Sequence, residues 1–375
     1  MPQVMHIDLT ELVAYPVQTG IQRVEREIIR NWPGPARLEA CRYDRASQRF
    51  VRLPDTVLTI FASEAVKSLD AEREALRPLL ENNEPLSAET LLLGLFNPEV
   101  FFDSSRANAY RDLCRRPSAN VAFLLYDFFP FLRPQDYPPA TPRSCMPYIQ
   151  AIREAPRVSF ISEQTQIEYT NRIVRNLGRT GPHFALGGDG LNIEKQKFDA
   201  NKNLFAYIGT IEPRKNVAVI LEAFEALWAR GSEGELVIIG RLDSRSAREL
   251  PILKRLESEA RFKHLGTASD NDIREVMRKA RATLFVSSAE GFGIPPIESL
   301  SAGVPIIVSP GLPCIDFLAP GGRIVLDAIS SEAVARAIES TLDDQTASRL
   351  WNEASQLAVP TWKDFVRRLA GWLHQ

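Results

Sequence analysis

Two carboxylates, those of Glu290 and Glu298, bracket a segment whose composition suits the binding of an anion. The apolar run 282–287 precedes the segment and a double proline lies within it. We therefore expect a strand, a tight loop and then a helix with Glu298 in its first turn. Glycines at 291 and 293 allow the backbone to approach a ligand closely, and the N–H groups at a helix start attract negative charge. A phosphate held between two carboxylates that can bind sugar hydroxyls describes a sugar nucleotide.

A second loop, GTIEPRKN at 209–216, carries two adjacent cations, Arg214 and Lys215. It follows the apolar stretch 204–209 and precedes apolar residues at helical spacing over 217–229. Two cations at the carboxyl end of a strand, beside the N–H groups of a new helix, suit a diphosphate. Lysine and arginine in a loop can also be merely solvated, but this position favours phosphate binding.

The first half of the chain offers two candidate site positions, each of which has two possible interpretations. Thr19 and Gly20 begin a helix, where a glycine is either a simple cap or a close contact for the same diphosphate from a second domain. Asp127 ends the apolar run 121–126. A carboxylate there often forms a turn, yet strand ends of this kind also line ligand sites, so a role toward the acceptor or substrate is plausible.

The histidines and possible metal ligands of the sequence give little indication of a binding site. His264 and Leu265, at the end of an expected strand, could border a nucleobase through their backbone. The four histidines form no ligand cluster and the four cysteines have no paired spacing. No Asp-x-Asp pair suited to a diphosphate-bound metal is evident, so the sequence requires no metal cofactor.

The order of apolar segments predicts an α/β fold. Strands and helices alternate through the second half, which requires a doubly wound parallel sheet with helices on both faces. The expected strands of this half lie at 204–209, 235–240, 261–266, 282–287, 304–309 and 323–326. The first half is less regular, with buried strands expected at 4–9, 90–96, 121–126 and 158–161.

Size and charge narrow the classes of function. A chain of 375 residues is expected to form two domains. The net charge of -2 gives no reason to expect nucleic acid binding, and scattered cysteines fit a reducing cytoplasm. Neither an export leader nor a membrane span is recognised, although basic helix faces could meet an anionic membrane surface peripherally.

In order along the chain, the motifs GTIEPRKN, VIIG, HLG, EGFGIPPIE and SAGVPII resemble the retaining glycosyltransferases of family 4, which have the GT-B fold. The resemblance covers the second half. The opening DLTELVAYPVQTGIQRVEREI and the segment YDFFPFLRP are similar to bacterial mannosyltransferase-like and rhamnosyltransferase-like members that build surface polysaccharide, such as O-antigen or exopolysaccharide. The resemblance implies two Rossmann-like domains that face a cleft, an acceptor-binding domain at 1–195 and a nucleotide-sugar domain at 196–357. It also implies a C-terminal helix at 358–375 that returns to the first domain.

The resemblance also implies roles for individual residues. Glu290 would contact the donor hexose, either as a nucleophile or only to orient the sugar. Glu298 would contact the ribose, and Lys215 with Arg214 the leaving diphosphate. The backbone of Gly291, Phe292, Gly293 and Ile294 would help, as would Gly20 from the opposite domain. Two positions depart from the pattern. Thr210 stands near a place where many members carry arginine, and Tyr126 near a place where some carry a sugar-binding histidine.

The expected reaction is transfer of a hexose from a nucleoside diphosphate sugar to a glycan or lipid-linked acceptor with retention of configuration. GDP-mannose is the preferred donor, followed by dTDP-rhamnose and UDP-hexoses. A nucleotide-sugar epimerase or a glycan phosphorylase on the same fold, and a non-catalytic sugar-binding protein, remain alternatives. A dinucleotide-dependent oxidoreductase is disfavoured because PVQTGIQR lacks the G-x-G-x-x-G turn.

Overall fold

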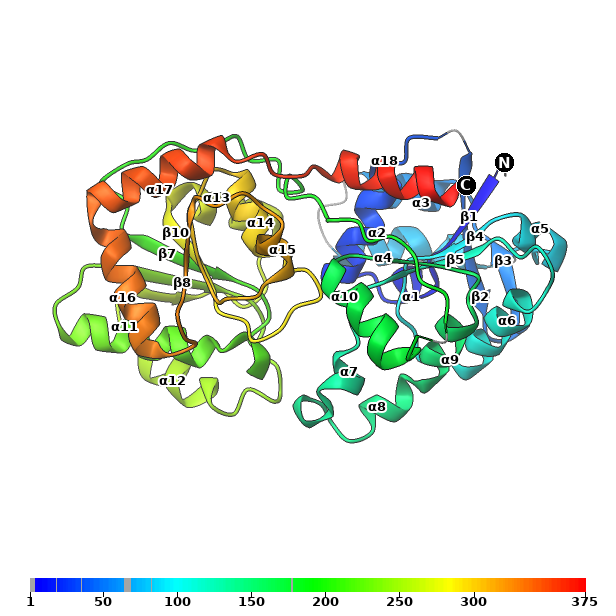
Figure 1. The fold of residues 1–375 in the computed structure, drawn as a ribbon, viewed down its shortest axis with the longest axis horizontal. Helices are drawn as coiled ribbons and strands as arrows, with labels where there is room; N and C mark the ends of the chain where they lie inside the picture. The colour runs from blue at the N-terminus through cyan, green and yellow to red at the C-terminus, as the bar shows by residue number, and fades with distance from the viewer. Residues whose placement is uncertain (1–3, 18, 35, 64–68, 82, 177) are drawn as a thin grey trace. The chain divides into compact units, whose positions relative to one another are not determined.

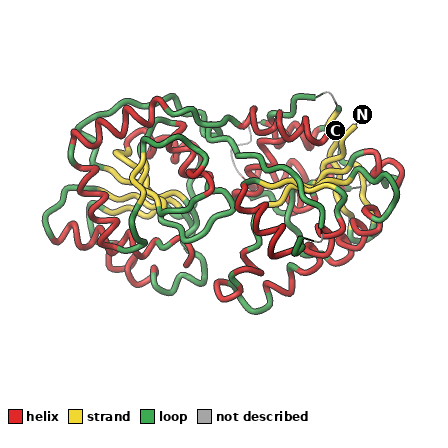
Figure 2. The backbone as a smooth tube through the Cα atoms, viewed as in Figure 1, coloured by secondary structure: helices red, strands yellow, loops and turns green. Residues whose placement is uncertain are grey.

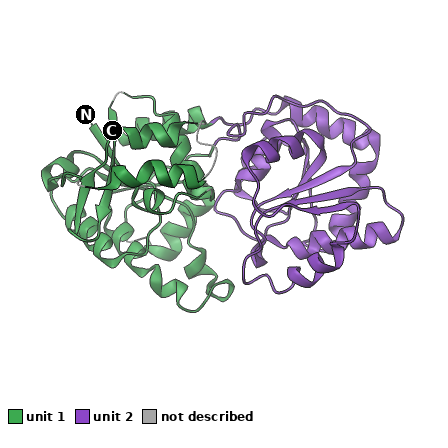
Figure 3. Cartoon of the chain, turned by 180° about the vertical axis from the view of Figure 1, so that it is seen from behind, with its two compact units in different colours: residues 1–186, 362–375 green, residues 187–361 purple. Residues whose placement is uncertain are grey.

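The computed structural model describes residues 4–17, 19–34, 36–63, 69–81, 83–176 and 178–375. The chain divides into two compact units (Figure 3). Unit 1 comprises Met1–Leu186 with Trp362–Gln375, and unit 2 comprises Gly187–Thr361. The expected boundary after residue 195 lies inside unit 2, and the binding role expected of each domain stays a prediction.

The described residues of unit 1 form a six-stranded sheet in the order β3-β2-β1-β4-β5-β6 (Figure 1). The strands are β1 (Val4–Asp8), β2 (Arg37–Asp44), β3 (Arg49–Arg52), β4 (Leu95–Asn97), β5 (Val121–Leu125) and β6 (Arg157–Phe160). The helices are α1 (Thr10–Ala14), α2 (Gly20–Arg30), α3 (Thr56–Ala62), α4 (Leu69–Leu76), α5 (Ala88–Leu93), α6 (Ser104–Cys114), α7 (Phe129–Leu132), α8 (Thr141–Ser144), α9 (Met146–Glu154), α10 (Glu163–Glu168) and α18 (Trp362–Leu373). Shorter helical turns span Arg77–Leu80, Pro134–Asp136 and Tyr169–Ile173.

Unit 1 departs from the sequence predictions in three places. The run 90–96 was expected to be one strand, but its first part belongs to α5 and only its end to β4. Ser87 caps α5 by accepting the Thr90 N–H, and leucines are strong helix formers, so the strand prediction was wrong for this part. A short helix, α1, precedes α2, and the antiparallel pair β2–β3 was not foreseen.

Unit 2 is built on a second six-stranded sheet, entirely parallel, in the order β12-β11-β10-β7-β8-β9. The strands are β7 (Leu204–Ile208), β8 (Glu235–Ile239), β9 (Phe262–His264), β10 (Ala280–Phe285), β11 (Ile306–Val308) and β12 (Arg323–Val325). The helices are α11 (Val217–Ala229), α12 (Glu249–Leu256), α13 (Asp270–Lys279), α14 (Ile294–Ser301), α15 (Pro313–Asp316), α16 (Ser331–Leu342) and α17 (Asp344–Gln356), and a 3-10 turn spans Pro213–Lys215.

Each strand expected in the second half overlaps one in unit 2, and within each unit the strands lie between helices (Figure 2). The core of unit 2 gathers the apolar faces of β7, β8 and β10 with those of α11 and α16. The doubly wound α/β class is therefore confirmed. In this sheet β7 is flanked by β8 on one side and β10 on the other, so the strand order reverses between β7 and β10. Ligands of such sheets bind beyond the carboxyl ends of the strands at this point.

The last helix, α18, belongs to unit 1 and packs against α2 (Figure 1). Its buried residues recur at helical spacing: Trp362, Phe365, Val366, Leu369, Ala370 and Leu373. Arg157 of β6 donates a hydrogen bond from Nη1 to the Leu373 carbonyl at 3.0 Å, which fixes the end of the helix. No helix within the described residues is long and apolar enough to cross a membrane.

Candidate functional site

The loops that follow β7 and β10 meet at the carboxyl edge of the unit 2 sheet. The strands pair in parallel, with Leu284 opposite Tyr207. Ser288 donates its N–H to the Arg214 carbonyl at 2.8 Å, and Asn216 donates from Nδ2 to the Val286 carbonyl at 3.0 Å. These bonds hold the two predicted cations beside the predicted glycine loop.

Lys215 is buried, and its Nζ donates a hydrogen bond to Oε1 of Glu290. The ammonium also lies 4.7 Å from the centroid of the Phe285 ring. Burial, the largest effect, lowers the pKa of Lys215, while the Glu290 charge opposes the change. A buried cation of this kind attracts an anion strongly because little water screens it.

Arg214 completes the pairing of Glu290. Its Nη1 lies 2.9 Å from Oε2 of Glu290 and donates to the Ala289 carbonyl at 2.8 Å. Desolvation alone would raise the pKa of Glu290, but Lys215 and Arg214 together outweigh it, so the pKa falls below the ordinary value. The carboxylate is therefore ionised at neutral pH, and each of its oxygens has its own cation.

The ion pairs continue beyond the residues predicted from sequence. Arg214 pairs with Glu212 at 2.8 Å, and Arg245 approaches both Glu212, at 3.1 Å, and Asp243, at 2.7 Å. The sequence reasoning missed Glu212, although it lies inside the GTIEPRKN motif. No sequence pattern indicated Arg245, because only the fold brings it to this edge of the sheet. The surrounding carboxylates fix the direction in which Arg214 points.

The glycine loop enters α14 through an uncommon backbone conformation. Gly293 has φ of +102°, and a Cβ there would lie 2.9 Å from Sγ of Cys314. Only glycine fits this position well. α14 begins at Ile294, and its first turn contains two prolines, which have no N–H. An anion would therefore depend on the loop N–H groups more than on those of the first helical turn. Phe292, in the loop, stacks on Phe317 with ring centroids 6.0 Å apart.

Glu298 lies in the second turn of α14, since the helix begins at Ile294, and not in the first turn as expected. It is buried, with only 3% of its surface exposed. The loop before α14 separates it from Glu290, so the two carboxylates flank the loop as the spacing predicts.

Three further predicted residues lie on the same edge of unit 2. Thr210 is exposed, and its carbonyl accepts a hydrogen bond from the Tyr207 hydroxyl at 3.0 Å. Nε2 of His264 lies 2.8 Å from the Gly240 carbonyl oxygen. The Leu265 N–H donates to the Ile238 carbonyl at 2.9 Å, so it is used within the sheet. A nucleobase contact at Leu265 would have to use its carbonyl or side chain.

The remaining two predicted residues lie in unit 1. Gly20 is the first residue of α2, whose cap is formed by Thr19 and Gln22 in a reciprocal capping box. Asp127 follows β5 and accepts the Phe129 N–H at 3.3 Å, as a turn-forming carboxylate does. Their roles toward donor or acceptor remain predictions.

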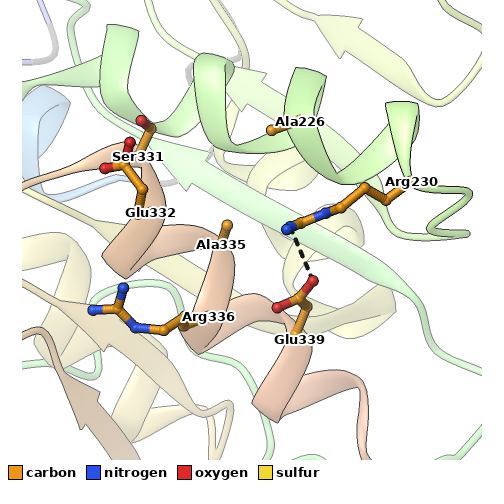
Figure 4. A pocket seen from close by; sticks show the side chains of 7 residues that line it. All are labelled: Ala226, Arg230, Ser331, Glu332, Ala335, Arg336 and Glu339. Carbon is orange, nitrogen blue, oxygen red and sulfur yellow. Dashed lines mark ion pairs between the residues drawn. The ribbon is translucent and has the colours of Figure 1, made fainter.

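A cavity of about 300 Å³ lies elsewhere in unit 2, between α11 and α16 (Figure 4). An ion pair of 2.9 Å joins Arg230 to Glu339 across it. None of the predicted site residues lines this cavity. Among the described residues, no group of three or more His, Cys, Asp or Glu could hold a metal ion.

A comparison with protein families indicates the kind of domain that carries the site. The family described as "Glycosyl transferases group 1" matches residues 190–357, a segment that contains both loops of the site. This segment is a group 1 glycosyltransferase domain. The match supports the prediction of a glycosyltransferase.

The group 1 domain and the rest of the chain resemble mannosyltransferases of Escherichia coli. The serotype-specific mannosyltransferase WbdA is 25% identical over 363 residues, which cover 90% of this chain but 42% of WbdA. The chain thus spans about two fifths of that relative's length. O-antigen chain mannosyltransferase B is 29% identical over 148 residues, covering 39% of this chain and 38% of the relative.

Solved structures share the fold of the whole chain. HepE of Anabaena, crystallised with UDP and glucose, gives a TM-score of 0.65 at 16% identity, covering 99% of both chains. Sucrose-phosphate synthase from Thermosynechococcus elongatus also gives 0.65, at 15% identity, covering 100% of this chain and 98% of that one. The fold that carries the group 1 domain is therefore of the GT-B type.

Proposed function

We propose that this chain transfers a hexose, preferably mannose, from a nucleoside diphosphate sugar to a glycan or lipid-linked acceptor of bacterial surface polysaccharide, with retention of the anomeric configuration. The observation that carries the proposal is the pairing of both oxygens of Glu290 with Lys215 and Arg214, beside the glycine loop. The mannosyltransferase relatives support the choice of sugar.

The chemistry follows from the charge that develops on the leaving group. The bond between the anomeric carbon and the phosphate oxygen breaks, and negative charge builds on the diphosphate. Lys215, Arg214 and the loop N–H groups would stabilise this charge more in the transition state than in the ground state. The acceptor hydroxyl bonds to the anomeric carbon on the face that the leaving group vacates, and its proton passes to the departing phosphate oxygen.

The two glutamates would then orient the donor. Glu290, held by two cations, would accept hydrogen bonds from hexose hydroxyls near the anomeric carbon, and Glu298 would accept those of the ribose. Gly20 would contact the diphosphate, and Asp127 the acceptor or substrate. Thr210 would contact the donor, and His264 and Leu265 would border its nucleobase. We propose cytoplasmic reaction, with peripheral contact to the inner membrane where the acceptor is lipid-linked.

A donor screen tests the proposal. The purified chain is incubated with GDP-mannose, dTDP-rhamnose or a UDP-hexose, with and without a lipid-linked oligosaccharide, and released nucleotide is measured. We expect release of GDP from GDP-mannose that depends on the acceptor. Isomerised or freed sugar in the acceptor's absence would favour an epimerase or a hydrolase, and no release from any donor would refute the proposal.

A further inference from the structure

A second cavity, of about 100 Å³, lies in unit 1 beside the first turn of α2. Its walls include Glu11, which follows β1, and Glu99 and Val100, which follow β4. In the unit 1 sheet β1 has β2 on one side and β4 on the other, so the strand order reverses between β1 and β4. The cavity therefore lies at the carboxyl edge of this sheet, where doubly wound folds bind ligands.

Glu25 of α2 lines this cavity, although only 1% of its surface is exposed. Its Oε2 has no hydrogen-bond partner among the residues that the structure describes. A buried polar atom without a partner is costly, and such atoms in native proteins commonly mark a binding site or a bound water. Glu25 thus indicates that the cavity receives a polar group.

Glu99, which also lines the cavity, is held by several hydrogen bonds. Its carboxylate accepts the N–H groups of Glu11 at 3.0 Å and Leu12 at 2.9 Å, and Arg106 donates to it at 2.5 Å. Burial, the largest effect, raises the pKa of Glu99 to about 7 and that of Glu25 well above its ordinary value, and the charge of Glu99 adds to the rise in the pKa of Glu25. Glu25 therefore favours its neutral form more than an ordinary glutamate does, and a neutral carboxyl can donate a hydrogen bond, while Glu99 offers acceptor oxygens.

We propose that this cavity binds hydroxyl groups of the acceptor glycan, with Glu25 donating a hydrogen bond to one hydroxyl oxygen and Glu99 accepting a hydrogen bond from a hydroxyl group. The inference rests on the proposed function. A hydroxyl group suits a pair of carboxyls, one neutral and one ionisable, better than a cation does, because it can both donate and accept a hydrogen bond. Ile21 and Val100 supply apolar wall for the C–H face of a sugar ring. Since one water occupies about 30 Å³, the cavity takes one edge of a sugar and not a whole residue.

The test compares two variants of Glu25 in the full-length chain. Glu25→Met removes both polar oxygens at similar length and is expected to raise the acceptor KM about tenfold, with the donor KM unchanged. Glu25→Gln keeps a donor and is expected to stay within about threefold of wild type. Glu27→Met is the matched control, because Glu27 is a buried glutamate on the same helix that pairs with Arg30 and is not part of the cavity wall.

Three results would overturn the inference: an unchanged acceptor KM in Glu25→Met, an equal rise in the donor KM, or the same effect in Glu27→Met. If the wild-type chain transfers no sugar at all, the proposed function fails separately. The cavity is then tested by saturation-transfer NMR with methyl α-mannopyranoside. A signal that Glu25→Met loses supports the site, while no signal, or one that Glu25→Met keeps, refutes it.

Discussion

Nη1 of Arg214 lies 2.9 Å from Oε2 of Glu290, and Lys215 holds the other oxygen of the same carboxylate. A donor diphosphate would bring a second anion to these two cations. The cations must then be shared between Glu290 and the phosphates. In this arrangement Glu290 is better suited to orienting the sugar than to attacking it, because its negative charge is already neutralised on both oxygens.

Lys215→Ala should lower kcat by about 10²- to 10³-fold, because it removes a fixed charge that stabilises the leaving diphosphate. Initial rates of nucleotide release at saturating donor and acceptor measure the effect. Lys279→Ala, which removes an exposed lysine of α13, is the control and should leave kcat unchanged. Equal activity of the two variants would remove Lys215 from the mechanism.

Glu298→Ala should weaken binding of a ribonucleotide about tenfold, through loss of hydrogen bonds from the ribose. Titration calorimetry with GDP and with 2′-deoxy-GDP separates this contact from general damage to the site. Wild type should prefer GDP, and the variant should bind both nucleotides alike. If Glu298→Ala kept the full preference for GDP, the ribose would be recognised by other residues.

Gly293→Ala should destabilise unit 2 by about 1 to 3 kcal/mol, because alanine at this positive φ is strained and its Cβ would press on Cys314. Thermal unfolding measures the loss. Gly20→Ala is the matched control: no atom lies within 4 Å of the added Cβ, so stability should not change. A fall in donor affinity in Gly20→Ala, without a change in stability, would support the diphosphate contact proposed for Gly20.

Stability should fall as the pH rises from about 5 to 8, and Glu25→Gln should reduce the slope. The folded pKa of Glu25 is raised well above 4.5 by burial, with Glu99 and Asp8 adding to the shift and Arg26 and Arg106 opposing it. The folded state therefore binds more protons than the unfolded one, so the stabilisation is full below the unfolded pKa and is lost as the pH rises through the folded pKa. Glu99, with a folded pKa of about 7, acts in the same direction.

Calorimetric unfolding at pH 5, 6, 7 and 8 checks this expectation. Glutamine stays neutral throughout, so the variant retains only the contribution of Glu99 and of the remaining groups. Parallel curves for the two proteins would mean that Glu25 does not titrate differently in the folded state.

The sequence predicts unit 2 well because its local signals agree. The apolar spacing over 217–229 matches α11 at both ends. In unit 1 the signals conflict. The leucines at 91–93 fit a buried strand or a helix equally, and the Ser87 cap decides for α5.

The site was predictable in its residue types but not in its pairings. Glycines, cations and carboxylates at strand ends indicate an anion site, yet the order of strands decides which loops meet. Because β10 inserts beside β7, Glu290 lies against Lys215, 75 positions away along the chain. The cavity at Glu25 and Glu99 had no sequence signal, since a glutamate on a helix is ordinarily solvated.

Proton NMR of the reaction with GDP-mannose and a glycan acceptor tests the proposed retaining transfer most directly. We expect a new anomeric signal of an α-mannoside, formed together with GDP, that is strongly reduced in Lys215→Ala. A β-linked product, or an α-mannoside formed at the wild-type rate by Lys215→Ala, would contradict it.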